Sequence, residues 1–126
     1  MKIDYYVELD TQMNTENYQK ILVMTFKFMD KDTNELFAEK KCTVNLLDGI
    51  LVNNLKNFIR DLNNSRNSYV VINNLLSVDK ISLYEDVFLF KTETQWGYTK
   101  IKLDVNDTII KAFHHISDLV ELNSSI

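Results

Sequence analysis

At 126 residues, the chain is long enough to form one domain with a substantial core, and its hydrophobic content of 45% excludes wholesale disorder. The net charge of −4 is spread along the sequence, and Arg60 and Arg66 are its only arginines. A phosphate-binding surface normally needs a stripe of Lys and Arg, so this composition disfavours direct nucleic-acid binding.

Three further properties bear on where the protein works. Its apolar runs are far shorter than a membrane span, and the residues after Met1 do not form an apolar leader. Cys42 is the single cysteine and cannot form an internal disulfide, which fits a reducing compartment. The absence of Pro and the abundance of Asn, Lys and Ile are typical of AT-rich coding sequences. We therefore expect a cytoplasmic protein of a bacterial cell or a phage-infected host, with no membrane partner.

Hydrophobic alternation predicts three strands in the first part of the chain. Residues 3–9 alternate apolar and polar side chains, which predicts a strand with one solvated face, and residues 10–17 are predicted to be a polar loop. Residues 18–29 carry the strongest strand pattern, and apolar residues on both faces at its start favour a central position in a sheet. An Asp- and Asn-rich turn at 30–34 leads into a return strand over 36–46, so this pair forms a hairpin.

Two amphipathic helices and several further strands follow. Asp48 is placed to cap a first helix, in which positions 51, 55, 58, 59 and 62 are apolar at the helical period. The next strands are predicted over residues 69–72, 81–84, 87–92 and 98–105, with turns at 85–86 and 93–97. Asp107 marks the start of a last helix over residues 106–122.

Residues 1–126 are therefore predicted to form a single α+β domain, an antiparallel sheet with two amphipathic helices. The run from Cys42 through Asp48 to Leu62 resembles the run from Ile101 through Asp107 to Val120. This similarity suggests two β-hairpin-plus-helix units that share one sheet. Chance similarity remains open, because a strand followed by a capped helix is a common arrangement.

The residues with catalytic or metal-binding chemistry do not form a recognisable motif. His114 and His115 are adjacent, so on a helix they point about 100° apart and cannot bind one metal ion from the same face. His114 and Asp118 can share a face, but a zinc site needs three or four ligands. Cys42 alternates with Val44 on the apolar face of a predicted strand, which favours a buried structural thiol. We therefore predict no catalytic residue, no metal and no cofactor.

Two groups of residues are candidates for a protein interface. Trp96 lies in the predicted turn at 93–97 together with Glu93, and Tyr98 begins the strand that follows. Trp and Tyr are frequent interface anchors. Trp96 is equally consistent with a side chain that folds back over the sheet edge to cover the core. The second group lies in the acidic N-terminal segment and consists of Tyr5, Tyr6, Glu8 and Asp10. A purely structural role for these residues is equally consistent with the pattern.

The order of these elements resembles that of small bacterial immunity proteins of the WapI type. The amphipathic helix at 52–62 is similar to theirs, and the stretches 87–90, 97–101 and 110–113 look like their second half. The absence of Pro departs from that group. Phage anti-defence inhibitors, such as anti-CRISPR proteins, share the same profile of a small, acidic domain without catalytic motifs. The resemblance implies a protein that occludes the active or nucleic-acid-binding surface of its partner.

From the sequence, we therefore expect a non-enzymatic inhibitor that binds a protein effector, one that is basic or processes nucleic acid. A homodimer is left open. An alternative is a small enzyme or ligand-binding module that uses His114, Asp118 or Cys42. A further alternative is an oligomeric structural component of a phage.

Overall fold

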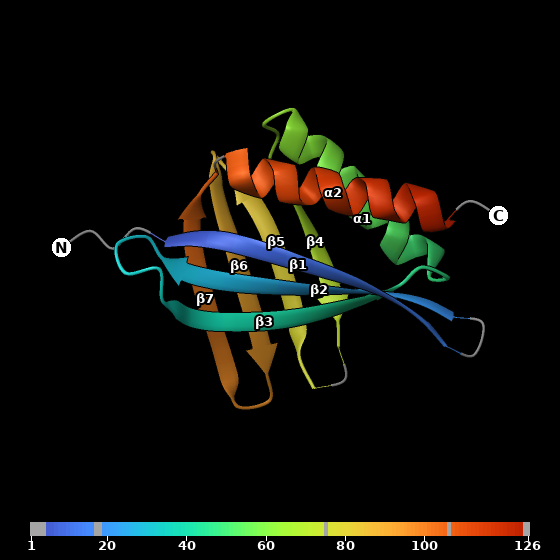
Figure 1. The fold of residues 1–126 in the computed structure, drawn as a ribbon, viewed down its shortest axis with the longest axis horizontal. Coiled ribbons are helices and arrows are strands. Elements are labelled where there is room, and N and C mark those ends of the chain that lie inside the picture. The colour runs from blue at the N-terminus through green and yellow to red at the C-terminus, as the bar shows by residue number, and fades with distance from the viewer. Residues whose placement is uncertain (1–4, 17–18, 75, 106, 125–126) are drawn as a thin grey trace.

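The computed structural model describes residues 5–16, 19–74, 76–105 and 107–124, and the side chains of residues 5, 16, 123 and 124 lie outside this description. The described chain is α+β, with seven strands and two helices (Figure 1). In chain order the elements are β1 (Tyr5–Glu16), β2 (Gln19–Asp30), β3 (Leu36–Asn45), α1 (Gly49–Asn63), β4 (Ser68–Asn73), β5 (Val78–Tyr84), β6 (Val87–Thr94), β7 (Gly97–Asp104) and α2 (Asp107–Ser124).

The first sheet is an antiparallel meander of β1, β2 and β3. The prediction of a loop over residues 10–17 is wrong as far as Glu16, because β1 continues to that residue and pairs with β2 along its whole length. Polar side chains in this part of β1 hid the strand, whose backbone hydrogen bonds do not depend on hydrophobicity. The turn after β2 is of the predicted Asp-rich kind, because the Asp30 side chain accepts hydrogen bonds from the backbone N–H groups of Asp32 and Thr33.

The second sheet is a four-stranded antiparallel meander of β4, β5, β6 and β7. Glu85 and Asp86 form the two-residue turn between β5 and β6, with φ angles of 48° and 64°. Positive φ at both positions is typical of the tight hairpin turns that match the strand twist. Gln95 and Trp96 form the turn between β6 and β7, and Gly97 follows with a φ of 141°, a value that favours glycine.

The two sheets pack face to face with their strands crossing steeply, and the core lies between them (Figure 1). The expectation of one shared sheet is therefore wrong, although each sheet is followed in the chain by one helix. The chain forms α1 between β3, the last strand of the first sheet, and β4, the first strand of the second. Aromatic rings join the layers: Phe26 of β2 lies 5.0 Å from Phe90 of β6, centroid to centroid.

Both helices lie along one side of the crossed sheets and pack against each other (Figure 1). α1 packs beside β4, and α2 packs beside β1. Asp48 caps α1 as predicted, because its side chain accepts a hydrogen bond of 3.1 Å from the N–H of Leu51. α2 begins at Asp107 itself, so this carboxyl group lies in the first helical turn, where the helix dipole favours negative charge. Within the described residues, neither helix is long and apolar enough to cross a membrane.

Candidate functional site

A polar cluster around Asp79 lies in the space between the two sheets. Asp79 of β5 is completely buried, and one of its oxygens accepts hydrogen bonds from the Cys42 thiol at 3.2 Å and from the Asn74 amide. Its other oxygen accepts a hydrogen bond of 2.8 Å from Thr92 of β6, and the Lys40 ammonium lies 3.6 Å away. Since Lys40 and Cys42 belong to β3, this one carboxyl group joins the first sheet to the second.

The cluster links the two sheets through hydrogen bonds and charge, and its thiol is held in the protonated form. Burial raises the pKa of the Cys42 thiol, and the charge of Asp79 together with its hydrogen bond raises it further. The thiol therefore keeps its proton at neutral pH, which removes the nucleophilic form. The structure confirms that Cys42 is buried, as its position in the predicted strand indicated. No side-chain nitrogen or oxygen buried among the described residues lacks a hydrogen-bond partner.

Asp79 was missed by the sequence analysis, although a signal was present. It alternates with Ile81 and Leu83, which are both buried, so the strand period places this acidic residue on the core face. An acidic residue at a core position of a strand predicts a buried polar network.

The remaining residues considered for catalysis do not join this cluster. His114 and Asp118 are exposed on α2, whereas Cys42 is completely buried on the core side of β3. These three side chains therefore do not share one pocket. In the described part of the chain, no group of three or more His, Cys, Asp and Glu side chains is placed to bind a metal ion.

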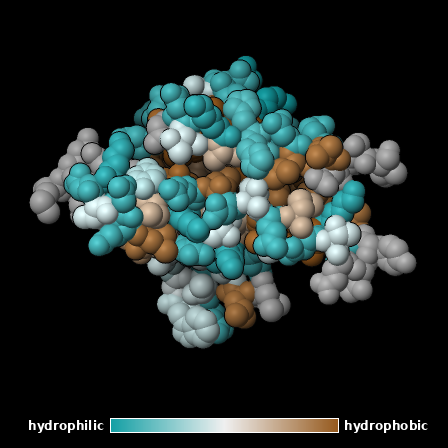
Figure 2. All heavy atoms as spheres, in the orientation of Figure 1, coloured by the Kyte–Doolittle hydropathy of each residue, from teal (hydrophilic) through white to brown (hydrophobic). Residues whose placement is uncertain are grey.

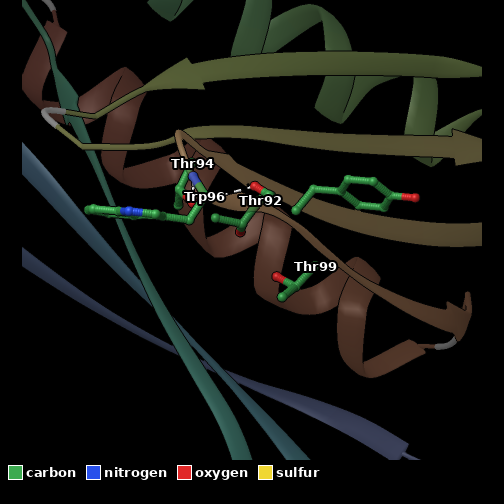
Figure 3. Close-up of a pocket in the computed structure, with 6 residues that line it drawn as sticks. Thr92, Thr94, Trp96 and Thr99 are labelled. Atoms are coloured by element: carbon green, nitrogen blue, oxygen red, sulfur yellow. Dashed lines mark hydrogen bonds between the residues drawn. The ribbon is translucent and has the colours of Figure 1, made fainter.

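Trp96 lies at the tip of the β6–β7 hairpin, which projects beyond β3 (Figure 1). Its side chain is 81% exposed, so it does not fold back to cover the core, which was one of the two alternatives. Beside it is a shallow hollow of about 280 Å³, which we call the threonine hollow; it is lined by Thr92, Thr94, Trp96, Gly97, Tyr98 and Thr99. Figure 3 shows the indole ring extending away from Thr99.

Local hydrogen bonds stabilise the turn that carries Trp96. The backbone N–H of Trp96 donates to the Thr94 hydroxyl at 3.2 Å, and this hydroxyl donates to the Gly97 carbonyl at 3.4 Å. Because β6 and β7 are also paired up to Thr94 and Gly97, the backbone at the tip is well defined while the indole remains in solvent.

The acidic N-terminal residues lie on a different surface. Glu8 and Asp10 are exposed on the outer face of the first sheet, where Asp10 forms an ion pair of 2.6 Å with Lys27. Tyr6 is half-buried, and its hydroxyl donates to the Asn34 side chain at 3.0 Å, which is a structural contact. Figure 2 views the molecule from the side of this sheet and shows a mostly hydrophilic surface. Tyr5 is the first residue of β1, but its side chain lies outside the described part.

The predicted interface residues therefore divide between two sheets. Glu93 and Tyr98 are directly paired across β6 and β7, on the face of the second sheet that points away from the core. A 2.7 Å ion pair joins Glu93 to Lys91, and the hydrogen bond from Lys91 lowers the pKa of the Glu93 carboxyl group. Two lysines, Lys91 and Lys100, also lie over the ring of Tyr98, so the surroundings of this residue are largely basic.

No protein-family model, no curated protein and no solved structure matches this chain.

Proposed function

We propose that this protein is a non-enzymatic inhibitor that acts by binding another protein, with the β6–β7 hairpin tip as its anchor. The observation that carries the proposal is the exposure of Trp96, whose side chain is 81% accessible on a well-defined turn. Trp is strongly enriched among the few interface residues that dominate binding energy. Burial of this side chain in a pocket of the partner would remove a large apolar surface from water.

The geometry of the hairpin tip supports binding without extensive rearrangement. Strand pairing holds the backbone on both sides of Trp96, so less conformational entropy is lost when a partner binds. The threonine hollow adds the Thr99 hydroxyl near the indole, which can form a hydrogen bond with a polar group of the partner. The hydroxyls of Thr92 and Thr94 already bond within the chain, to Asp79 and to the turn that carries Trp96.

The state of the Cys42 thiol, the most reactive type of side chain here, agrees with a non-enzymatic mode of action. The Cys42 thiol is buried, protonated and engaged as a hydrogen-bond donor to Asp79. His114 and Asp118 are exposed on α2, on the surface rather than in the cluster around that thiol.

The proposed partner is an effector that processes nucleic acid, and the two proposed contexts are an immunity protein and a phage anti-defence protein. Such effectors have basic surfaces, and this chain carries a net charge of −4. Glu8 and Asp10 belong to a different sheet from Trp96, so we assign them a long-range role. Their charges would speed the encounter with a basic partner more than they would tighten the final complex.

The proposal is tested by capture of the partner from the native host, followed by binding and activity measurements with the purified partner. We expect the wild-type protein to bind this partner and to inhibit its activity. Trp96→Ala should weaken binding by about thirtyfold or more, since a residue that anchors an interface contributes about 2 kcal/mol or more.

Leu122→Ala is the matched control, because Leu122 is 75% exposed but lies on α2. This variant should bind and inhibit like the wild type. If the activity of the captured protein is unchanged, the proposed inhibition is refuted. If its affinity is the same for Trp96→Ala and wild type, the proposed anchor is refuted.

A further inference from the structure

Three lysines form a row across the outer face of the second sheet. Lys80 of β5 is paired directly with Lys91 of β6, and Lys91 is paired directly with Lys100 of β7. Neighbouring strands are about 4.8 Å apart, so the three side chains leave the sheet close together on the same side. Lys102 lies on the same face, two residues after Lys100. We call this surface the lysine face; it also carries Tyr69, Tyr84 and Tyr98.

The lysine row should lower the stability of the sheet, and nothing in the fold requires lysines at these positions. Like charges directly opposite each other on paired strands are destabilising. Among the residues that the structure describes, Lys91 forms an ion pair with Glu93, but Lys80, Lys100 and Lys102 form none. Lysines on an edge strand are often explained as protection against aggregation, but Lys80 and Lys91 belong to the two interior strands. On these strands only two carboxyl groups, those of Glu93 and Asp104, lie on the same face as the four lysines. This surface is therefore basic, although the net charge of the chain is −4.

Aromatic rings accompany the ammonium groups. Lys80 lies 4.6 Å from the ring centroid of Tyr69, and Lys91 and Lys100 lie 4.9 and 5.1 Å from that of Tyr98. The tyrosine side chains are more than 60% exposed, at 62% for Tyr69, 63% for Tyr84 and 62% for Tyr98. On the lysine face, ammonium groups therefore lie over two exposed tyrosine rings, at about 5 Å from the ring centroids.

Against the expectation from the overall composition, we propose that the lysine face binds single-stranded nucleic acid, because folding gathers lysines that are separated along the chain. A single strand alternates phosphates with unpaired bases, and this face offers an ammonium group for the first beside a ring for the second. Exposed aromatic side chains on a four-stranded sheet stack on bases that are not already stacked in a duplex. An acidic protein would match the charge of this face but would make no specific use of its exposed tyrosine rings. The proposal does not rest on the protein partner proposed at Trp96, although Tyr98 belongs to both the threonine hollow and the lysine face.

The test uses the full chain and a fluorescein-labelled 20-nucleotide oligothymidylate, with binding followed by fluorescence anisotropy between 50 and 200 mM NaCl. The wild type should show saturable binding, with a slope of log affinity against log salt of about −2.8 for four lysines. The double variant Lys80→Gln/Lys100→Gln should reduce this slope to about −1.4. Tyr98→Ala should weaken binding about fivefold or more and leave the salt slope unchanged, because it removes stacking without removing charge.

Lys31→Gln/Lys111→Gln is the matched control, because it removes the same charge from exposed residues outside the lysine face. This control should retain the wild-type affinity and salt slope. Equal losses in the two double variants would mean attraction by overall charge and would overturn the proposal. The proposal would also be overturned if duplex DNA bound more tightly than the oligonucleotide. Binding of polyglutamate or heparin, with no binding of the oligonucleotide, would overturn it as well.

Discussion

At the scale of single residues, Asp79 and Cys42 show how a buried polar pair joins two layers. Asp79 accepts hydrogen bonds from Cys42 of the first sheet and Thr92 of the second, and the Lys40 ammonium lies 3.6 Å away. A carboxyl group in this position is stabilising only because its partners are all present, since an unpaired buried charge is costly. The network therefore specifies how the sheets are placed relative to each other.

The buried thiol predicts a dependence of stability on alkaline pH. The pKa of Cys42 is higher in the folded chain than its usual value of about 8.5, so the folded protein retains a proton that the unfolded chain loses. Its contribution is complete below about pH 8.5 and is lost as the pH rises. Urea unfolding should show the free energy of unfolding falling by up to about 1.4 kcal/mol per pH unit between pH 8.5 and 9.5.

Cys42→Ser serves as the control for this prediction, because it retains a donor for Asp79 but has no group that titrates in this range. Its stability should be nearly flat over the same interval. A thiol reagent at pH 8 should react quickly with the wild type in urea and slowly in its absence. Rapid reaction of the folded protein would contradict the buried, protonated state.

At the scale of elements, the β5–β6–β7 meander determines the surface chemistry of the second sheet. The two-residue turns at 85–86 and 95–96 set the register that aligns Lys80, Lys91 and Lys100. Along the chain these lysines are about ten residues apart, so they do not form a visible cluster in the sequence. The turns at 85–86 and 93–97 were nevertheless predicted. Because the length of a hairpin turn fixes which residues are paired, the exact length of the second turn would have shown that these lysines are aligned.

The lysine row predicts a variant that gains stability while it loses binding. Lys100→Glu replaces a like-charge pair with an opposite-charge pair opposite Lys91, so the free energy of unfolding should increase by about 0.5 kcal/mol. The same change should weaken oligothymidylate binding, because it reverses a charge on the lysine face. Lys102→Glu is the control for stability: it makes the same change in net charge, but Lys102 is directly opposite Leu89, so the new carboxyl group has no directly opposite lysine. An equal increase in both variants would mean that the row carries no local repulsion.

At the scale of the whole molecule, Phe113 connects every layer of the fold. This residue of α2 lies 6.1 Å from Phe26 of the first sheet, 5.9 Å from Phe88 of the second and 5.5 Å from Phe58 of α1, measured between ring centroids. It is almost completely buried. The two sheets and two helices therefore share one core, and we expect them to unfold together.

Phe113→Ala should lower the free energy of unfolding by about 3–5 kcal/mol, because it leaves a cavity where the layers meet. Urea unfolding followed by far-UV circular dichroism should show a single transition shifted to lower urea. Tyr84→Ala, a truncation of an exposed aromatic residue, should change the free energy of unfolding by about 0.5 kcal/mol or less. Two separate transitions in the wild type would contradict the prediction of a single domain over residues 1–126.

By itself, the sequence determined the nature of the elements and the α+β class. Periods of two and 3.6 residues, turn residues and the Asp48 cap depend on neighbours along the chain, so strands such as β2 and the helix α1 were predicted closely. It also identified Trp96 as a turn residue, although not its exposure. Only the tertiary structure decided that there are two crossed sheets, that Asp79 joins them, and that Trp96 and Glu8 lie on separate surfaces. These features depend on contacts between distant segments, whose energies come from strand register and shared burial rather than from any local pattern.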